Sequence, residues 1–215
     1  MHSDVQHRTL AAGYKYNKAN FVGVTKKIPR GEKRRKLIFR SLHDCIIRKG
    51  YSKTTLAEIA ESAGMSPSHL LYYFKGKEAI LEDYFQNVAL QILERLDSFR
   101  DRPTQEQIDL LTDLFFAGNG ITRSEIGFML ECFGVAVNDK VLRKEKAQLD
   151  VQCKQYLTDL FDNTPRPIIA SATDCAEICY SMLIGLRSAV FFDDNIELAD
   201  ARRLFNSSVS SMAGL

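Results

Sequence analysis

Two helix starts lie close together in the stretch TTLAEIAESAGMSPSHLLYYFK, and they constrain the fold of this chain more than any other feature. Thr55 and Glu58 have the spacing of a capping box, which opens a helix. Gly64 suits the left-handed backbone position that ends this helix. Ser66 then caps a second helix, with Pro67 at its first position, where the missing N–H costs nothing. Two short helices joined by a glycine-containing turn form a helix-turn-helix unit.

The second of these helices is predicted to present polar and aromatic side chains to solvent. Each helix is about two turns long, less than the roughly 12–15 residues that an isolated helix needs, so both must pack on a neighbour. Leu70 and Phe74 lie four residues apart and can anchor the second helix inward. The residues left near the surface are Pro67, Ser68, His69, Tyr72 and Tyr73. This is the arrangement of a recognition helix, whose N-terminal residues reach base edges in the major groove. Two alternatives stay open: the tyrosines pack against neighbouring helices, and His69 is an ordinary surface residue.

Charge divides the chain into two parts. Residues 1–77 hold 16 Lys and Arg against 5 Asp and Glu, a net charge of +11, whereas residues 78–215 hold 13 against 22, a net charge of −9. Such asymmetry predicts an anionic partner for the first part, either nucleic acid or a membrane surface. Basic residues from Lys33 to Lys36 crowd the start of a helix, where cations oppose the helix dipole. Folding does not explain them, but phosphate contacts would.

Helical periodicity continues to the end of the chain, and no segment shows the alternation of a strand. The fold class predicted is all-α with about nine helices. Residues 1–29 are predicted to form a flexible basic arm, residues 30–77 the helix-turn-helix domain, and residues 78–215 a larger helical domain. Beyond the two short helices, the helices are expected at 32–49, 77–99, from Thr104 to about 117, from Thr122 to about 138, 139–161, 172–192 and 196–212.

The sequence lacks the common motifs of enzyme active sites. It contains no nucleophile elbow, phosphate loop or metal-ligand spacing, and all four histidines precede residue 70. We therefore predict no catalytic residue, no metal and no cofactor. The five cysteines are scattered without CxxC spacing, which favours reduced thiols packed in helices and a cytoplasmic protein. No apolar run approaches the roughly 20 residues of a membrane span.

The stretch GYSKTTLAEIAESAGMSPSHLLYYFKGKEAIL resembles the DNA-binding core of the TetR (tetracycline repressor-like) family of bacterial regulators. The resemblance covers about residues 32–84. It rests on the spacing of Gly, paired Thr, Ile-Ala, Ala-Gly, Tyr-Phe and Lys-Glu. Two positions depart from the family pattern: Leu71 stands where many members have Tyr, and Pro67 stands where a polar residue is more usual. Operator preference therefore cannot be transferred from a relative.

The resemblance implies a set of DNA contacts. Thr55 would open the supporting helix near a phosphate, Pro67 to His69 would face bases, and the two tyrosines would touch backbone or base. The DNA-binding residues implied are Lys33, Arg34, Thr54, Thr55, Pro67, Ser68, His69, Tyr72, Tyr73, Lys75 and Lys77.

The resemblance also implies a homodimer whose C-terminal domain holds a small-molecule effector cavity and the dimer interface. The cavity candidates are Phe115, Phe116, Phe128, Met129, Cys132 and Phe133, for which plain core packing is the alternative. The interface candidates on the helix at 172–192 are Ala176, Cys179, Leu183, Leu186 and Val190, which could join a four-helix bundle or an intramolecular core.

Together these features predict a ligand-responsive transcriptional regulator. It would be a repressor that binds a palindromic double-stranded DNA operator as a dimer and leaves it when a small-molecule effector binds, without membrane association. The alternative is a non-catalytic interaction protein that uses its basic N-terminal segment on an anionic surface. A membrane-binding helix would need one long amphipathic face, whereas residues 54–75 are divided into two capped turns.

Overall fold

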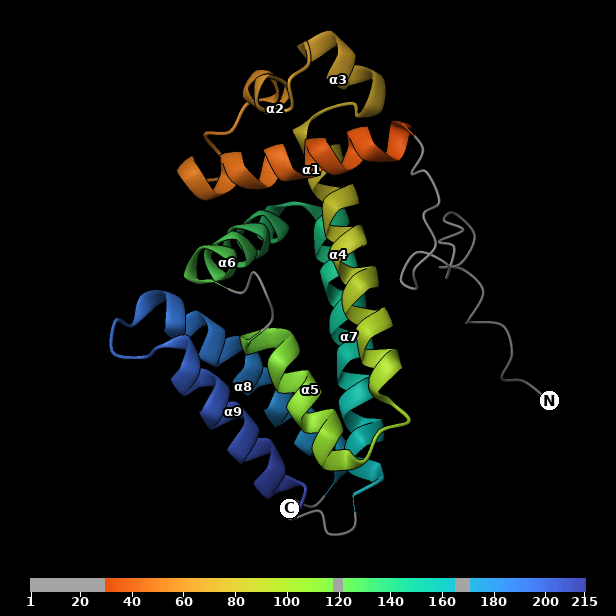
Figure 1. The fold of residues 1–215 in the computed structure, drawn as a ribbon, viewed down its shortest axis with the longest axis vertical. Coiled ribbons are helices and arrows are strands. Elements are labelled where there is room, and N and C mark those ends of the chain that lie inside the picture. Colours follow the sequence, from red (N-terminus) through yellow and green to blue (C-terminus); the bar gives the residue numbers. More distant parts are fainter. Residues whose placement is uncertain (1–29, 118–121, 165–170) are drawn as a thin grey trace, which may run out of the picture. The chain divides into compact units, whose positions relative to one another are not determined.

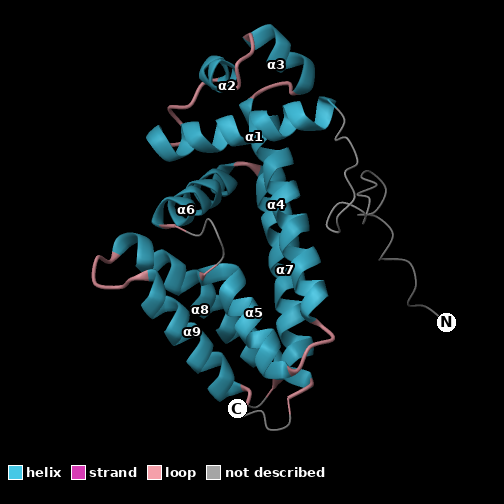
Figure 2. Ribbon diagram, in the orientation of Figure 1, coloured by secondary structure: helices cyan, strands magenta, loops and turns pink. Residues whose placement is uncertain are grey.

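The structure is a computed structural model that describes residues 30–117, 122–164 and 171–215. These residues form nine helices and no strand, which confirms the predicted all-α fold (Figures 1 and 2). The helices are α1 (Arg30–Lys49), α2 (Leu56–Ser62), α3 (Pro67–Tyr73), α4 (Lys77–Phe99), α5 (Thr104–Phe116), α6 (Arg123–Asn138), α7 (Lys140–Asp162), α8 (Ala172–Phe192) and α9 (Leu198–Met212).

The chain divides into two compact units, Met1–Arg35 and Lys36–Leu215, and the division falls within α1. The predicted basic arm, residues 1–29, lies outside the described residues. The boundary predicted near residue 77 lies inside the larger unit and stays a prediction.

One hydrophobic core of the larger unit gathers around the helix-turn-helix. It contains Ile38, Leu42 and Ile46 of α1, each no more than 2% exposed, with Ile59 of α2 and Leu70 of α3. The first turns of α4 and one face of α6 complete it through Ile80, Leu81, Phe128 and Cys132. The two short helices thus obtain the packing partners that their length requires.

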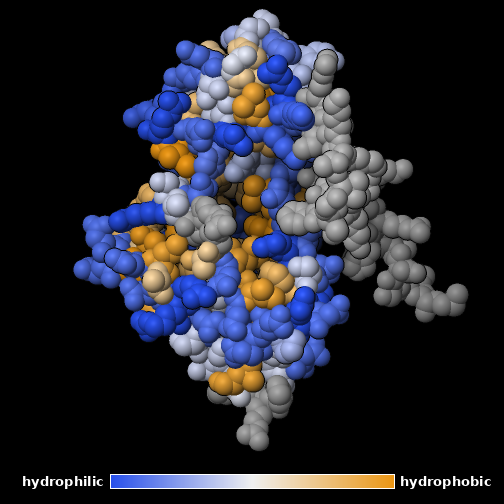
Figure 3. Space-filling view, in the orientation of Figure 1, coloured by the Kyte–Doolittle hydropathy of each residue, from blue (hydrophilic) through white to orange (hydrophobic). Residues whose placement is uncertain are grey.

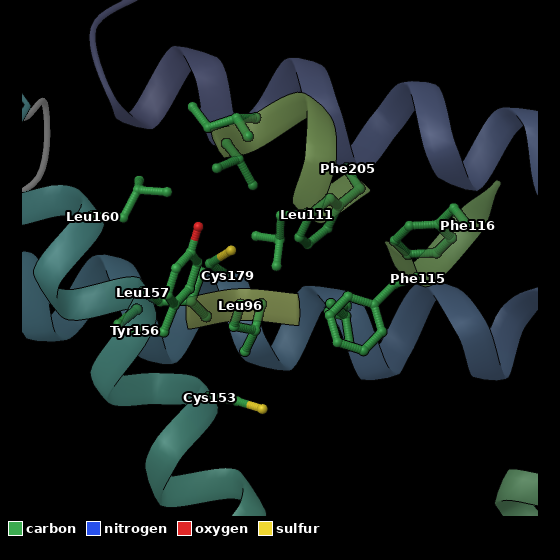
Figure 4. Close-up of a cluster of buried hydrophobic side chains, with 14 of the residues drawn as sticks. Leu96, Leu111, Phe115, Phe116, Cys153, Tyr156, Leu157, Leu160, Cys179 and Phe205 are labelled. Atoms are coloured by element: carbon green, nitrogen blue, oxygen red, sulfur yellow. The ribbon is translucent and has the colours of Figure 1, made fainter. Parts of the chain in front are cut away.

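A second core lies among α4, α5, α7, α8 and α9 and includes Ile126 of α6. Figure 4 shows side chains from these helices pointing toward one another, among them Leu111, Tyr156, Cys179 and Phe205. Phe205 is fully buried, and its ring centroid lies 5.3 Å from that of Phe116. Among the described helices, only α8 is long and apolar enough to cross a membrane. One face of α8 is buried in this core, so its hydrophobicity is explained by packing.

The predicted interface stripe on α8 is wrong. Ala176, Cys179, Leu183 and Val190 are at most 5% exposed because they form the buried face of α8 in the second core, and Leu186 packs against the same core. Periodicity marked the apolar face correctly, but it could not tell an intramolecular contact from a contact between chains.

The six residues predicted for an effector cavity do not share one environment. Phe115, Phe116 and Met129 belong to the second core, whereas Phe128 and Cys132 face the helix-turn-helix core. Phe133 lies under the ammonium of Lys146, which is 4.6 Å from its ring centroid. Their spacing along the chain grouped residues that the fold separates.

Two helix starts also differ from the prediction. Pro103, not Thr104, is the N-cap of α5, and the Gln107 side chain donates to the carbonyl of Arg102 (2.8 Å) instead of closing a capping box. Helix α9 begins at Leu198, two residues later than predicted, and follows a turn in which the Asp193 carboxylate accepts from the backbone N–H of Asn195 (2.9 Å).

All five cysteines are buried and free of disulfides, as the sequence predicted. Burial raises the pKa of the Cys132 and Cys153 thiols to about 12, so both stay protonated at neutral pH. Their protonated state makes them poor nucleophiles.

Candidate nucleic-acid interface

The cap of α2 is formed as the sequence predicts. The Thr55 hydroxyl oxygen accepts from the Glu58 N–H (3.3 Å), and the Glu58 carboxylate accepts from the Thr55 N–H (2.9 Å). Hydrogen bonds from Lys49 and Thr55 lower the pKa of Glu58 to about 2, so the carboxylate is charged at neutral pH. Gly64 has a φ of +62° in the turn, a conformation that suits glycine. Ser66 then caps α3 by accepting from the His69 N–H (3.2 Å).

Helix α3 has one buried face and one exposed face. Leu70 is 0% exposed and Phe74 5% exposed, which confirms their predicted role as anchors. Pro67, Ser68 and His69 at the N-terminal end are exposed. Tyr72 is 84% exposed, a large aromatic surface that no helix of the described chain covers.

The two tyrosines of α3 have different environments. Tyr73 is half-buried between its neighbours, with ring centroids 5.6 Å from His69 and 5.4 Å from Tyr72. The alternative that the tyrosines pack against neighbouring residues is therefore correct in part for Tyr73, whereas Tyr72 is exposed. His69, Tyr72 and Tyr73 form one aromatic surface on α3.

Thr54 does not belong to this surface. Its side chain is 1% exposed, and its hydroxyl donates to the Gly50 carbonyl (2.9 Å). The DNA contact that the resemblance implied for its side chain is therefore corrected. Thr54 closes the loop between α1 and α2.

Lys77 has protein partners for part of its ammonium group. Its Nζ donates to the carbonyls of Tyr51 (3.0 Å) and Thr54 (2.9 Å) and lies 4.4 Å from the Tyr51 ring centroid. An ammonium has three donors, so one is left for a phosphate. Lys33, Arg34 and Lys75 are exposed, as phosphate contacts require.

Replacing Lys77 with methionine is expected to lower the free energy of unfolding by about 1–3 kcal/mol, because two hydrogen bonds from a charged donor are lost. Lys75→Met is the matched control: Lys75 is exposed, so we expect a change within about 0.5 kcal/mol. Denaturant unfolding of both variants measures this difference. Equal effects would contradict a structural role for Lys77.

Two carboxylates of α6, which no sequence pattern singles out for this role, contact α1 and the turn that follows it. Glu125 Oε2 lies 2.9 Å from His43 Nε2, and Glu131 accepts from the backbone N–H of Tyr51 (3.0 Å). Between them Phe128 packs on His43, with ring centroids 4.6 Å apart. His43 and Glu125 are 82 positions apart, and no local pattern announces such a pair.

Comparison with known proteins supports the interpretation of this domain. The family model described as bacterial regulatory proteins, tetR family, matches residues 38–84, which span most of α1 and all of α2 and α3. Over residues 38–84 the chain is therefore similar to the domain that this family model describes. A Bacillus subtilis (strain 168) protein named "Probable HTH-type transcriptional regulator YttP" is 32% identical over 65 residues, which cover 28% of this chain and 31% of that protein. The match thus spans about a third of that relative's length.

Solved structures of transcriptional regulators share the fold over most of this chain. A TetR transcription regulator from Haloarcula marismortui ATCC 43049 has a TM-score of 0.73 at 18% identity, over 84% of this chain and 98% of that one. A transcriptional regulator from Saccharomonospora viridis in complex with choline has a TM-score of 0.73 at 18% identity, over 83% and 96%. These identities show a shared fold.

Proposed function

We propose that this protein is a ligand-responsive transcriptional repressor of the TetR family that binds a palindromic operator as a homodimer in the cytoplasm. The observation that carries the proposal is the division of α3: Leu70 is fully buried, while Pro67, Ser68, His69 and Tyr72 face outward. A recognition helix needs such a division, because one face must be fixed to the protein and the other must enter the major groove.

The proposed contacts fall into two kinds. Ser68 and His69 carry hydrogen-bonding groups at the start of α3 and would read base edges. Lys33, Arg34 and Lys75 would neutralise phosphates, which fixes the position of the protein on the duplex without reading sequence. Tyr72, with its exposed hydroxyl and ring, fits either the backbone or a thymine methyl group.

Helix α6 is the proposed route from effector to operator. It contributes to both hydrophobic cores, through Phe128 to the helix-turn-helix core and through Ile126 to the C-terminal core. An effector that prefers one position of α6 would therefore change the position of α1 and shift the equilibrium between bound and free operator. Response to a small molecule agrees with the S. viridis neighbour, whose structure contains choline.

The outer face of α8 is the proposed dimer interface, in place of the buried stripe. Ile178 and Phe192 are 47% and 73% exposed, and Ser181 and Gly185 lie between them on the same face. No atom lies within 4 Å of a Cβ built on Gly185, so a second helix could approach closely there. Leu204 of α9, 37% exposed, adds apolar surface for a four-helix bundle of two α8 and two α9 helices.

The test is a selection of bound sequences from random duplex DNA at several salt concentrations. We expect an enriched palindrome whose half-sites lie about 34 Å, or a multiple of one helical turn, apart. His69→Ala should change which sequences are enriched, while Lys75→Ala should weaken binding to all sequences and flatten the salt dependence.

Two outcomes would contradict the proposal. Salt-sensitive binding without enrichment would favour the alternative of a basic surface for anionic partners. Equal losses on all sequences for His69→Ala and Lys75→Ala would show that α3 does not read bases.

A further inference from the structure

Arg187 is a charged residue in the hydrophobic part of the C-terminal domain. It lies on the buried face of α8 with Leu183 and Val190, and it is 8% exposed. Its guanidinium carbon is 5.8 Å from the ring centroid of Phe115 on α5. A buried charge is costly to folding unless it is paired and hydrogen-bonded.

Among the described residues, the buried Nε of this guanidinium has no hydrogen-bond partner. The carboxylates of the surrounding helices are paired with other groups: Glu125 with His43, and Asp150 with Lys146. Burial lowers the pKa of Arg187 to about 10 and the charge of Glu125 opposes this effect, so the guanidinium is still protonated at neutral pH.

The surroundings of Arg187 are otherwise apolar or aromatic. Phe115 and Tyr180 lie near the guanidinium, and both belong to the second core or pack against it. On the face in Figure 3, hydrophobic and hydrophilic side chains lie side by side around a hollow between α6 and α4. An apolar environment around a buried cation whose Nε has no bond within the described residues fits a ligand that has an apolar body and one anionic end.

We propose that Arg187 is the anion-recognising residue of the effector site, and that the effector is a small carboxylate with an apolar body. This inference rests on the function proposed above, because it names the chemical class of the effector. A carboxylate offers two oxygens to the planar guanidinium and satisfies it bidentately. A quaternary ammonium such as choline would meet a like charge and is excluded by the same geometry.

Glu125 would connect this site with the DNA-reading domain. Its charge acts on Arg187, and its Oε2 lies 2.9 Å from His43 Nε2 on α1. An effector carboxylate at Arg187 adds a second negative charge near Glu125, and like charges repel. The repulsion would displace the first turn of α6 and weaken its contact with α1, which agrees with release from the operator.

The experiment measures thermal unfolding and heats of binding for the full chain with a series of probes. The probes are benzoate and the linear monocarboxylates from butanoate to decanoate; the controls are the primary amides of the same skeletons and choline. Calorimetry suits this protein because it has no tryptophan to report binding by fluorescence. We expect at least one carboxylate to raise the unfolding midpoint, and its amide and choline to leave it unchanged.

Two variants test the role of Arg187 itself. Arg187→Met should weaken carboxylate binding about tenfold to hundredfold, since a charged hydrogen-bonded pair is lost. Without any carboxylate, the thermal unfolding midpoint of this variant should equal or exceed that of the wild type, because a buried charge is replaced by an apolar side chain of similar length. Glu125→Gln should bind the carboxylate more tightly, because one repulsive charge is removed.

The proposal is overturned if no carboxylate in the series binds, if an amide binds as well as its acid, or if Arg187→Met keeps the wild-type affinity. An Arg187→Met protein that unfolds or loses stability without ligand would also overturn it, since the guanidinium would then have partners within the protein. An enriched operator without any carboxylate effect contradicts this site alone. Carboxylate binding through Arg187 without an enriched DNA sequence contradicts the proposed regulatory function, whereas the proposed carboxylate site still stands.

Discussion

Replacing Leu70 with alanine is expected to lower the free energy of unfolding by about 2–5 kcal/mol and to abolish operator binding. Leu70 is 0% exposed and is the only residue within α3 that is buried in the helix-turn-helix core. A helix of seven residues has no stability of its own, so its position depends on this anchor. Denaturant unfolding measures the first effect, and titration with the selected operator measures the second.

Leu71→Ala is the matched control for this change. The same side chain is removed one position along the helix, where it is 50% exposed, so the free energy of unfolding should change by no more than about 0.5 kcal/mol. If Leu70→Ala and Leu71→Ala lost similar stability, the assignment of the buried face of α3 would be wrong.

Phe205→Ala is expected to cost about 3–5 kcal/mol of the free energy of unfolding. Phe205 lies on α9, and its ring is fully buried and packs against Phe116 of α5. Its loss therefore leaves a cavity. Denaturant unfolding at fixed protein concentration measures the loss. The concentration must be fixed because self-association would add to the apparent stability.

Phe192→Ala on α8 removes the same side chain from a site that is 73% exposed. The free energy of unfolding of the single chain should stay within about 0.5 kcal/mol of wild type. The dissociation constant of the proposed dimer should rise, as measured by sedimentation over a series of protein concentrations. Unchanged dimerisation would place the interface outside this end of α8.

Much of the fold followed from local signals in the sequence. The caps at Thr55, Ser66 and Thr122 act as predicted, because a cap depends on residues three positions apart. The anchors Leu70 and Phe74 are also local, since helical geometry alone places them on one face. The division of α3 into a buried and an exposed face was therefore available from the sequence.

The remaining features depend on contacts between distant segments. Periodicity identified the apolar face of α8 but not its partner, so the stripe from Ala176 to Val190 was taken for an interface. Thr54 was grouped with Thr55 by the family pattern, although its hydroxyl bonds the Gly50 carbonyl. That no described residue bonds the Arg187 Nε could not be predicted from the sequence, because it is a property of the packed interior.

Two polar contacts of α6, one with α1 and one with the turn after it, add to the hydrophobic core that α6 shares with α1. Because they lie at different places along α1 and its following turn, together they limit rotation of α1 against α6 more than either contact does alone. His43 lies on α1, and Tyr51 lies eight positions later in the turn that follows this helix. Gly50, with a φ of +81°, lets the backbone turn so that the Tyr51 N–H meets Glu131. Losing the Glu125 contact while keeping the Glu131 contact would free α1 to rotate against α6. In the proposed dimer, the two α3 helices would then lose their common spacing without any change in α3 itself.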